Sequence, residues 1–156
     1  MKALEYFKSM TKHIPGEVTL IAELGVRNKG RPSFKTLLLN IFVPFIRFRD
    51  KPTWRFLALV NNDSLHYLEY AYGDEEVIAS YSMPLAEMTD IEVEVKQNGF
   101  IHKLGFMFRE KKQNFDVWAY PSIFLISEIP NMSKEEQDEF KHMTEELIRK
   151  IQTKGM

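Results

Sequence analysis

The most distinctive feature of the sequence lies between positions 27 and 55, where basic residues flank a run of apolar residues on both sides. This basic segment, residues 27–55, holds eight Lys or Arg residues against the single acid Asp50, for a net charge of +7. Each Lys or Arg near an anionic membrane gains about 1 kcal/mol, and apolar side chains at a loop tip can enter the interface. We therefore predict contact with anionic lipid. The candidate phosphate ligands are Lys29, Arg31, Lys35, Arg47, Arg49, Lys51 and Arg55, and the candidate wedge is Phe42, Phe45, Ile46 and Phe48.

Other interpretations of the basic segment stay open. Residues 37–43 alternatively form a buried strand with solvated cations at its ends. The apolar surface of residues 37–48 alternatively docks a partner protein or a second copy of the chain, which predicts a homo-oligomer. Nucleic acid is a less favoured ligand: Trp54 and Phe56 could stack on bases, but the sequence pI of 6.4 and the acidic remainder argue against it.

Catalytic and metal-binding patterns are not evident in the sequence. The four histidines are scattered without the spacing of a zinc site, and the absence of Cys excludes disulfides and thiolate catalysis. The acidic clusters at residues 74–76, 90–94 and 135–139 fit a turn, a solvated strand face and a helix N-terminus. No phosphate-binding glycine loop or nucleophile elbow is present. We therefore expect no enzyme activity, no cofactor and no metal.

Apolar residues alternate with polar ones along much of the chain, and turn signals recur every 8–12 residues. This pattern predicts antiparallel strands, and these strands would hold the basic segment in place. In residues 17–26, Val18 and Leu20 are expected to face the core, whereas Ile21 and Glu23 face outward. A polar turn is expected at residues 110–114. The predicted strands are residues 17–26, 34–43, 54–60, 65–72, 77–83, 88–96, 100–109 and 115–120.

A helix is predicted at residues 133–154, after Pro130. Ser133 and Glu136 form a capping-box pattern at its start. Its apolar stripe consists of Phe140, Met143, Leu147, Ile148 and Ile151. The fold class is therefore α+β, mainly β: a small antiparallel, partly open barrel or sandwich of about seven strands closed by one C-terminal amphipathic helix.

The length of 156 residues predicts a single domain. Within it we expect a helical appendage at residues 1–16, strands within residues 17–126 and the closing helix at residues 133–154. No apolar run reaches the roughly 18 residues that a spanning helix needs. Lysines interrupt the start of the chain where a signal peptide would be apolar, so a cytoplasmic protein is expected.

Three stretches resemble the pleckstrin-homology-like (PH-like) superfold, particularly its bacterial members and the related GRAM domains. Pro15-Gly16-Glu17 is similar to the opening before the first strand, and residues 56–70 resemble the strand–turn–strand hairpin. Residues 81–91 are similar to an element in which Pro and Leu precede spaced apolar residues. The resemblance covers about residues 15–154. It implies a binding domain whose first strand–strand connection is the usual lipid-headgroup site.

From the residues and this resemblance, we predict a non-enzymatic PH-like binding module of uncharacterised ligand. It would attach peripherally to the anionic inner membrane surface through the basic segment. The alternative is a protein-interaction or self-association module that uses residues 37–48. A third class, an enzyme or small-molecule carrier, would need a concave site lined by convergent polar groups.

Overall fold

The computed structural model describes Glu5, Thr11 and residues 14–25, 53–71, 77–120 and 132–154. The strand expected at residues 34–43 lies outside this part of the chain. So does most of the helical appendage expected at residues 1–16, apart from Glu5, Thr11 and residues 14–16.

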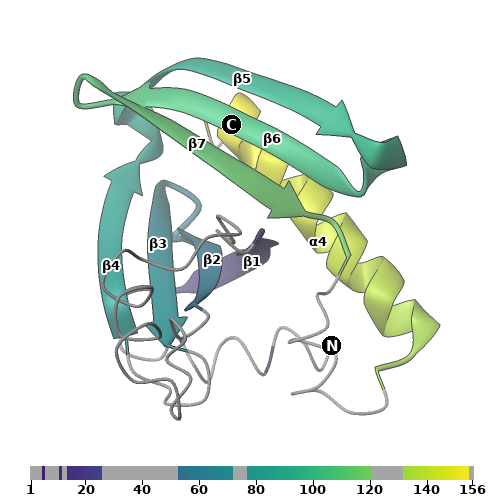
Figure 1. Cartoon of the computed structure of the whole chain (residues 1–156). Coiled ribbons are helices and arrows are strands. Elements are labelled where there is room, and N and C mark those ends of the chain that lie inside the picture. Colours follow the sequence, from purple (N-terminus) through teal and green to yellow (C-terminus); the bar gives the residue numbers. More distant parts are fainter. Residues whose placement is uncertain are drawn as a thin grey trace, which may run out of the picture.

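Seven strands form one antiparallel sheet with the order β4-β3-β2-β1-β7-β6-β5 (Figure 1). Their bounds are β1 Val18–Leu24, β2 Thr53–Val60, β3 Ser64–Ala71, β4 Val77–Pro84, β5 Met88–Lys96, β6 Ile101–Phe108 and β7 Lys111–Trp118. Two single 3₁₀ turns, η1 at Leu85–Glu87 and η2 at Gln97–Gly99, join β4 to β5 and β5 to β6. The one long helix of the described residues is α4, Lys134–Gln152. The predicted mainly-β α+β fold is confirmed.

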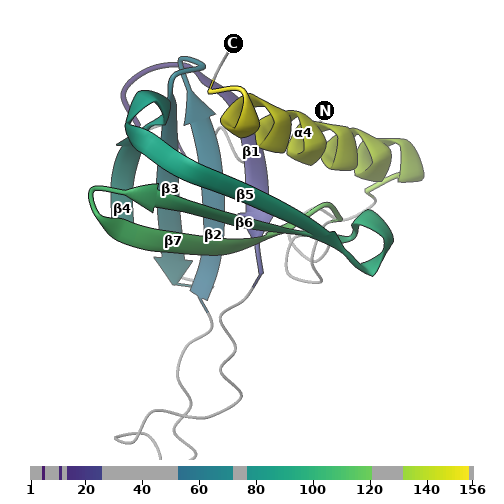
Figure 2. The same ribbon diagram turned by 90° about the horizontal axis from the view of Figure 1, so that it is seen from above.

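The sheet bends where its two halves join. Strand β1 pairs with β7 over only two residue pairs, Glu23 with Trp118 and Leu24 with Val117. By contrast, β2 and β3 pair along their whole length. Figure 2 shows β5–β7 crossing in front of β1–β4 at a steep angle. Among the described strands, β4 and β5 are the two edges, so the barrel is not closed.

Left-handed backbone conformations make the hairpin turns. Asn61 and Asn62 have φ values of 54° and 57° between β2 and β3, which fits the tight turn that Asn favours. Between β6 and β7, Arg109 and Glu110 have φ values of 49° and 65°. The turn predicted at residues 110–114 is therefore wrong, because β7 already pairs with β6 from Lys111. The polarity of residues 111–114 instead reflects exposure on a projecting hairpin (Figure 1).

The inner cluster of apolar side chains lies between the two halves of the sheet. It joins the inward residues of all seven strands to the second half of α4. Burying a large apolar side chain contributes about 1.5–3 kcal/mol, so this cluster contributes strongly to stability. Its members include Leu57, Leu59, Leu65, Met83, Met88, Leu104, Phe106, Phe115, Val117, Leu147, Ile148 and Ile151.

An outer cluster covers the opposite face of β1–β3. Here Phe140 and Met143 from the first half of α4 pack on side chains of the sheet. Ile21 and Glu23 were predicted to face outward from the core. The prediction that they are exposed is wrong, because both side chains are fully buried. Strand alternation could not reveal this, since it does not show that a helix crosses the outer face. The cluster members on the sheet include Val18, Ile21, Trp54, Phe56, Ala58, Val60, Leu68 and Tyr70.

The sequence signals of α4 are found in the structure. The Ser133 hydroxyl accepts a hydrogen bond from the backbone N–H of Glu136 at 3.2 Å, as an N-cap should. All five residues of the predicted apolar stripe are buried. No helix in the part of the chain described here is both long and apolar enough to cross a membrane.

Candidate functional site

The predicted lipid-contact residues fall almost wholly outside the described part of the chain. Of the eleven candidates, the structure describes Arg55 alone. The prediction for the others stays a prediction, but the framework on both sides of them is well defined. Gly25 follows the end of β1 and Thr53 begins β2.

Contacts with two other strands, β2 and β7, hold Gly25 at the end of β1. The backbone N–H of Gly25 donates to the Asp116 carbonyl oxygen on β7 at 2.7 Å. Its own carbonyl oxygen accepts from Arg55 Nη2 on β2, also at 2.7 Å. A Cβ at Gly25 would lie 2.6 Å from Trp118 Nε1, so only glycine fits without a shift of the indole. Gly25 is therefore held in place at the junction of the two half-sheets.

Arg55 belongs to the framework and is not an exposed cation of the kind that the sequence predicted. Its side chain is only 5% exposed and lies on the same strand face as Leu57 and Leu59 of the inner cluster. It interacts with the hydroxyl of Tyr67, which donates a 2.9 Å hydrogen bond to Glu69 Oε2. Sequence spacing could not separate Arg55 from the other cations, because a cation at a strand start is usually solvated.

Tyr67 is the centre of this buried polar group. Burial, the largest effect, raises the pKa of its hydroxyl to about 12, with Glu69 adding to the rise and Arg55 opposing it. The ring stacks on Tyr81 of β4, with centroids 4.8 Å apart, and lies 5.8 Å from Phe115 of β7. Tyr67 therefore connects the aromatic packing between the half-sheets to the arginine that holds Gly25.

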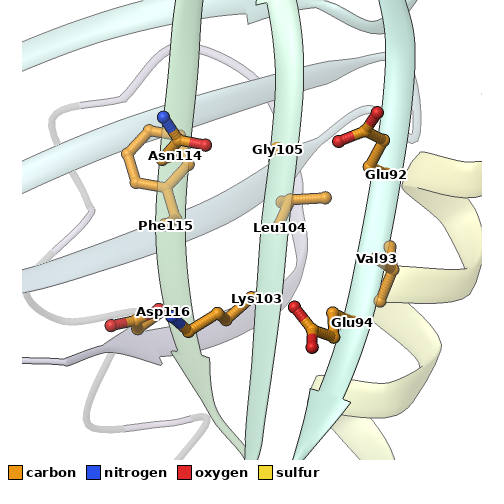
Figure 3. Close-up of a pocket in the computed structure, with 9 residues that line it drawn as sticks. All are labelled: Glu92, Val93, Glu94, Lys103, Leu104, Gly105, Asn114, Phe115 and Asp116. Atoms are coloured by element: carbon orange, nitrogen blue, oxygen red, sulfur yellow. The ribbon is translucent and has the colours of Figure 1, made fainter.

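A shallow concavity of about 310 Å³ lies on the outer face of β5–β7 (Figure 3). Gly105 forms part of it, and Glu92 and Glu94 on one side lean toward β6. The cations nearby are Lys103 and Lys112, the latter with its Nζ 3.6 Å from Glu92 Oε2. The sequence signal that could have indicated it is the isolated glycine in a strand.

The chemistry of this concavity is limited. Its carboxylates are exposed and spread over two strands, so they can attract a cation only weakly in water. No group of three metal-ligating side chains occurs among the described residues. We therefore do not assign a catalytic or metal site there.

The two histidines on strands do not approach each other as a pair of ligands would. His66 Nε2 lies 2.6 Å from Ser80 Oγ at the surface. His102 is 8% exposed within β6, and neither of its ring nitrogens has a hydrogen-bond partner in the structure.

No known family model matches the sequence, and no curated protein matches it. Among solved structures, the chain is similar to the hSac2 domain from human phosphoinositide phosphatase Sac2, with 13% sequence identity and a TM-score of 0.45. The alignment covers 97% of this chain and 81% of that one. A similarity at this level transfers no function to this chain.

Proposed function

We propose that this chain is a non-enzymatic, PH-like binding module that docks on anionic membrane surfaces through the basic segment. The observation that carries the proposal is a separation of charge between the framework and the β1–β2 connection. The described residues hold eleven Lys or Arg against seventeen Asp or Glu, a net charge of −6. Residues 26–52 hold seven against one, a net charge of +6.

This separation gives the molecule a preferred orientation at a charged surface. An anionic membrane repels the acidic framework and attracts the connection, and both effects act within about 8 Å at physiological salt. In Figure 2 the end of β1 and the start of β2, which flank the connection, lie at the lower edge of the sheet, whereas α4 lies at the upper right. Helix α4 carries six acids against four Lys or Arg. Docking through the connection therefore keeps the acidic helix away from the lipid.

The apolar residues of the connection supply the second part of the proposed mechanism. Cations alone give an association that salt removes, whereas apolar side chains in the interface hold the protein at moderate salt. In this mechanism Phe45 enters the interface, and the phosphate contacts come from Lys29, Arg31, Lys35, Arg47 and Arg49.

Co-sedimentation with vesicles tests the proposal. We expect binding to vesicles of phosphatidylserine and phosphatidylcholine, weaker binding as salt rises, and none to phosphatidylcholine alone. Neutralising four cations together, with Lys29→Gln, Arg31→Gln, Arg47→Gln and Arg49→Gln, removes about 4 kcal/mol and weakens binding several-hundred-fold.

A matched variant controls for total charge. It neutralises four exposed framework cations, with Lys103→Gln, Lys111→Gln, Lys134→Gln and Lys154→Gln. We expect it to lose much less binding than the first variant, because the connection keeps all of its cations and only the repulsion of the framework increases. Absence of binding to anionic vesicles at low salt, or equal losses in the two variants, contradicts the proposal. If Phe45→Glu instead dissociates a dimer and leaves vesicle binding unchanged, residues 37–48 form a protein-contact surface.

A further inference from the structure

The two edges of the sheet differ in how they are protected. Natural edge strands usually carry charges or prolines that prevent pairing with another chain. Edge strand β5 follows this rule, because Asp90, Glu92, Glu94 and Lys96 are distributed along it. Edge strand β4 has no charged residue in eight, and its single proline, Pro84, is the last residue.

Several side chains of β4 are also partly exposed to solvent. Ile78 is 54% exposed, and Ser80, Tyr81 and Ser82 form a continuous exposed run. Within the described ranges, β4 pairs with a strand only on its β3 side. The pairing with β3 is regular from Ala79 to Pro84, after a bulge at Ile78. An extended, regular and uncharged edge of this kind is a template for strand addition.

We propose that β4 pairs antiparallel with β4 of a second copy of this chain, which makes a two-fold symmetric dimer. Two identical β4 strands bring no like charges together, so this edge is complementary to itself. The same pairing through β5 would place Glu92 and Glu94 opposite acidic residues of the copy, which is unfavourable. Charge therefore favours one of the two possible symmetric dimers.

Side-chain size favours a register centred on Ser80. A two-fold axis there sets Ile78 opposite Ser82 of the copy and Tyr81 opposite Ala79 of the copy. Each bulky side chain then meets a small one, and cross-strand neighbours lie about 4.5–5.5 Å apart. If β4 of one molecule paired with β5 of the next, each end of the assembly would keep one free edge. Further molecules could then add, and the assembly would grow without limit. The symmetric pairing closes after two copies.

Sedimentation equilibrium of the full chain over a range of concentrations tests this proposal. We expect a reversible monomer–dimer equilibrium for the wild type. The substitution Ile78→Lys acts twice in a symmetric dimer, and we expect it to raise the dissociation constant roughly tenfold or more. Hydrogen exchange should show protection of the backbone amides of residues 77–84 that increases with protein concentration.

Val95→Lys on β5 is the matched control. Val95 is 57% exposed, so this variant removes a similarly exposed β-branched side chain and adds the same charge on the other edge. We expect it to leave the dimer intact. A wild type that stays monomeric, equal weakening by both variants, or unchanged exchange of residues 77–84 on dimerisation overturns the inference. A dimer that Phe45→Glu dissociates and Ile78→Lys does not would also overturn it and assign the contact to residues 37–48.

Discussion

The outer face of β1–β3 is covered by apolar side chains, whereas the outer face of β5–β7 is charged and open to water. Phe56 and Ile21 are buried under the first half of α4. The corresponding outward positions of the other half hold Glu92, Lys103 and Asp116. One half-sheet therefore has two apolar faces and the other has one. Substitutions on the outer faces should have very different effects in the two halves.

The largest expected effect comes from truncating the outer cluster. Phe56→Ala removes a side chain that is 1% exposed, and we expect it to lower the free energy of unfolding by about 3–5 kcal/mol. Lys103→Ala, at an outward position of β6, should change it by less than about 0.5 kcal/mol. Urea denaturation measures both. Similar effects of the two substitutions would contradict the contrast between the half-sheets.

Gly25 and Gly105 allow a second comparison between a closely packed position and an open one on the outer face of β6. Gly25→Ala places a Cβ against the Trp118 indole, and we expect a loss of about 1–3 kcal/mol from overpacking. At Gly105 the added Cβ meets the ends of the Asn114 and Lys112 side chains at 3.2 Å, and these can move. Gly105→Ala should therefore be close to neutral in thermal or urea unfolding. A Gly105→Ala variant as unstable as Gly25→Ala would show that the concavity is rigid.

Tyr67 joins the half-sheets, and its hydroxyl gives a pH test. Tyr67→Phe removes the hydrogen bond to Glu69 and should cost about 1–2 kcal/mol at neutral pH. Because the pKa rises from 10.0 to about 12 on folding, the folded state retains the proton longer than the unfolded state. The stability gained from this shift is complete below pH 10 and is lost as the pH rises toward 12. The Phe variant should lack this part of the alkaline decline in urea unfolding.

The smallest effect is expected at His102, on the inner side of β6. Because neither ring nitrogen has a partner, replacing the ring with an apolar side chain removes buried polar atoms without breaking a hydrogen bond. His102→Leu should be neutral or stabilise the fold by up to about 1 kcal/mol. A loss above 1 kcal/mol in the same urea assay would indicate a polar contact that His102 makes in solution.

The sequence predicted the local structure well where periodicity and turn chemistry agree. The stripe from Phe140 to Ile151 and the Asn61–Asn62 turn are both confirmed. The burial of Ile21 was not predictable, because its cluster includes residues of α4, which is more than 100 residues away in the sequence. The role of Arg55 was missed for a related reason. Its partners Gly25 and Tyr67 come from two other strands, and only the register of the sheet brings them to it.

The contact between Arg55 and Gly25 has a consequence for how this protein can vary. It ties together the two strands between which residues 26–52 are inserted, through atoms of Gly25 and Arg55, which lie outside residues 26–52. Each doubling of loop length costs only about 0.6 kcal/mol, so a connection with fixed ends tolerates large changes in length. The length and sequence of residues 26–52 can therefore change without loss of the framework. We expect the framework to fold unchanged when a different connection is grafted between Gly25 and Thr53.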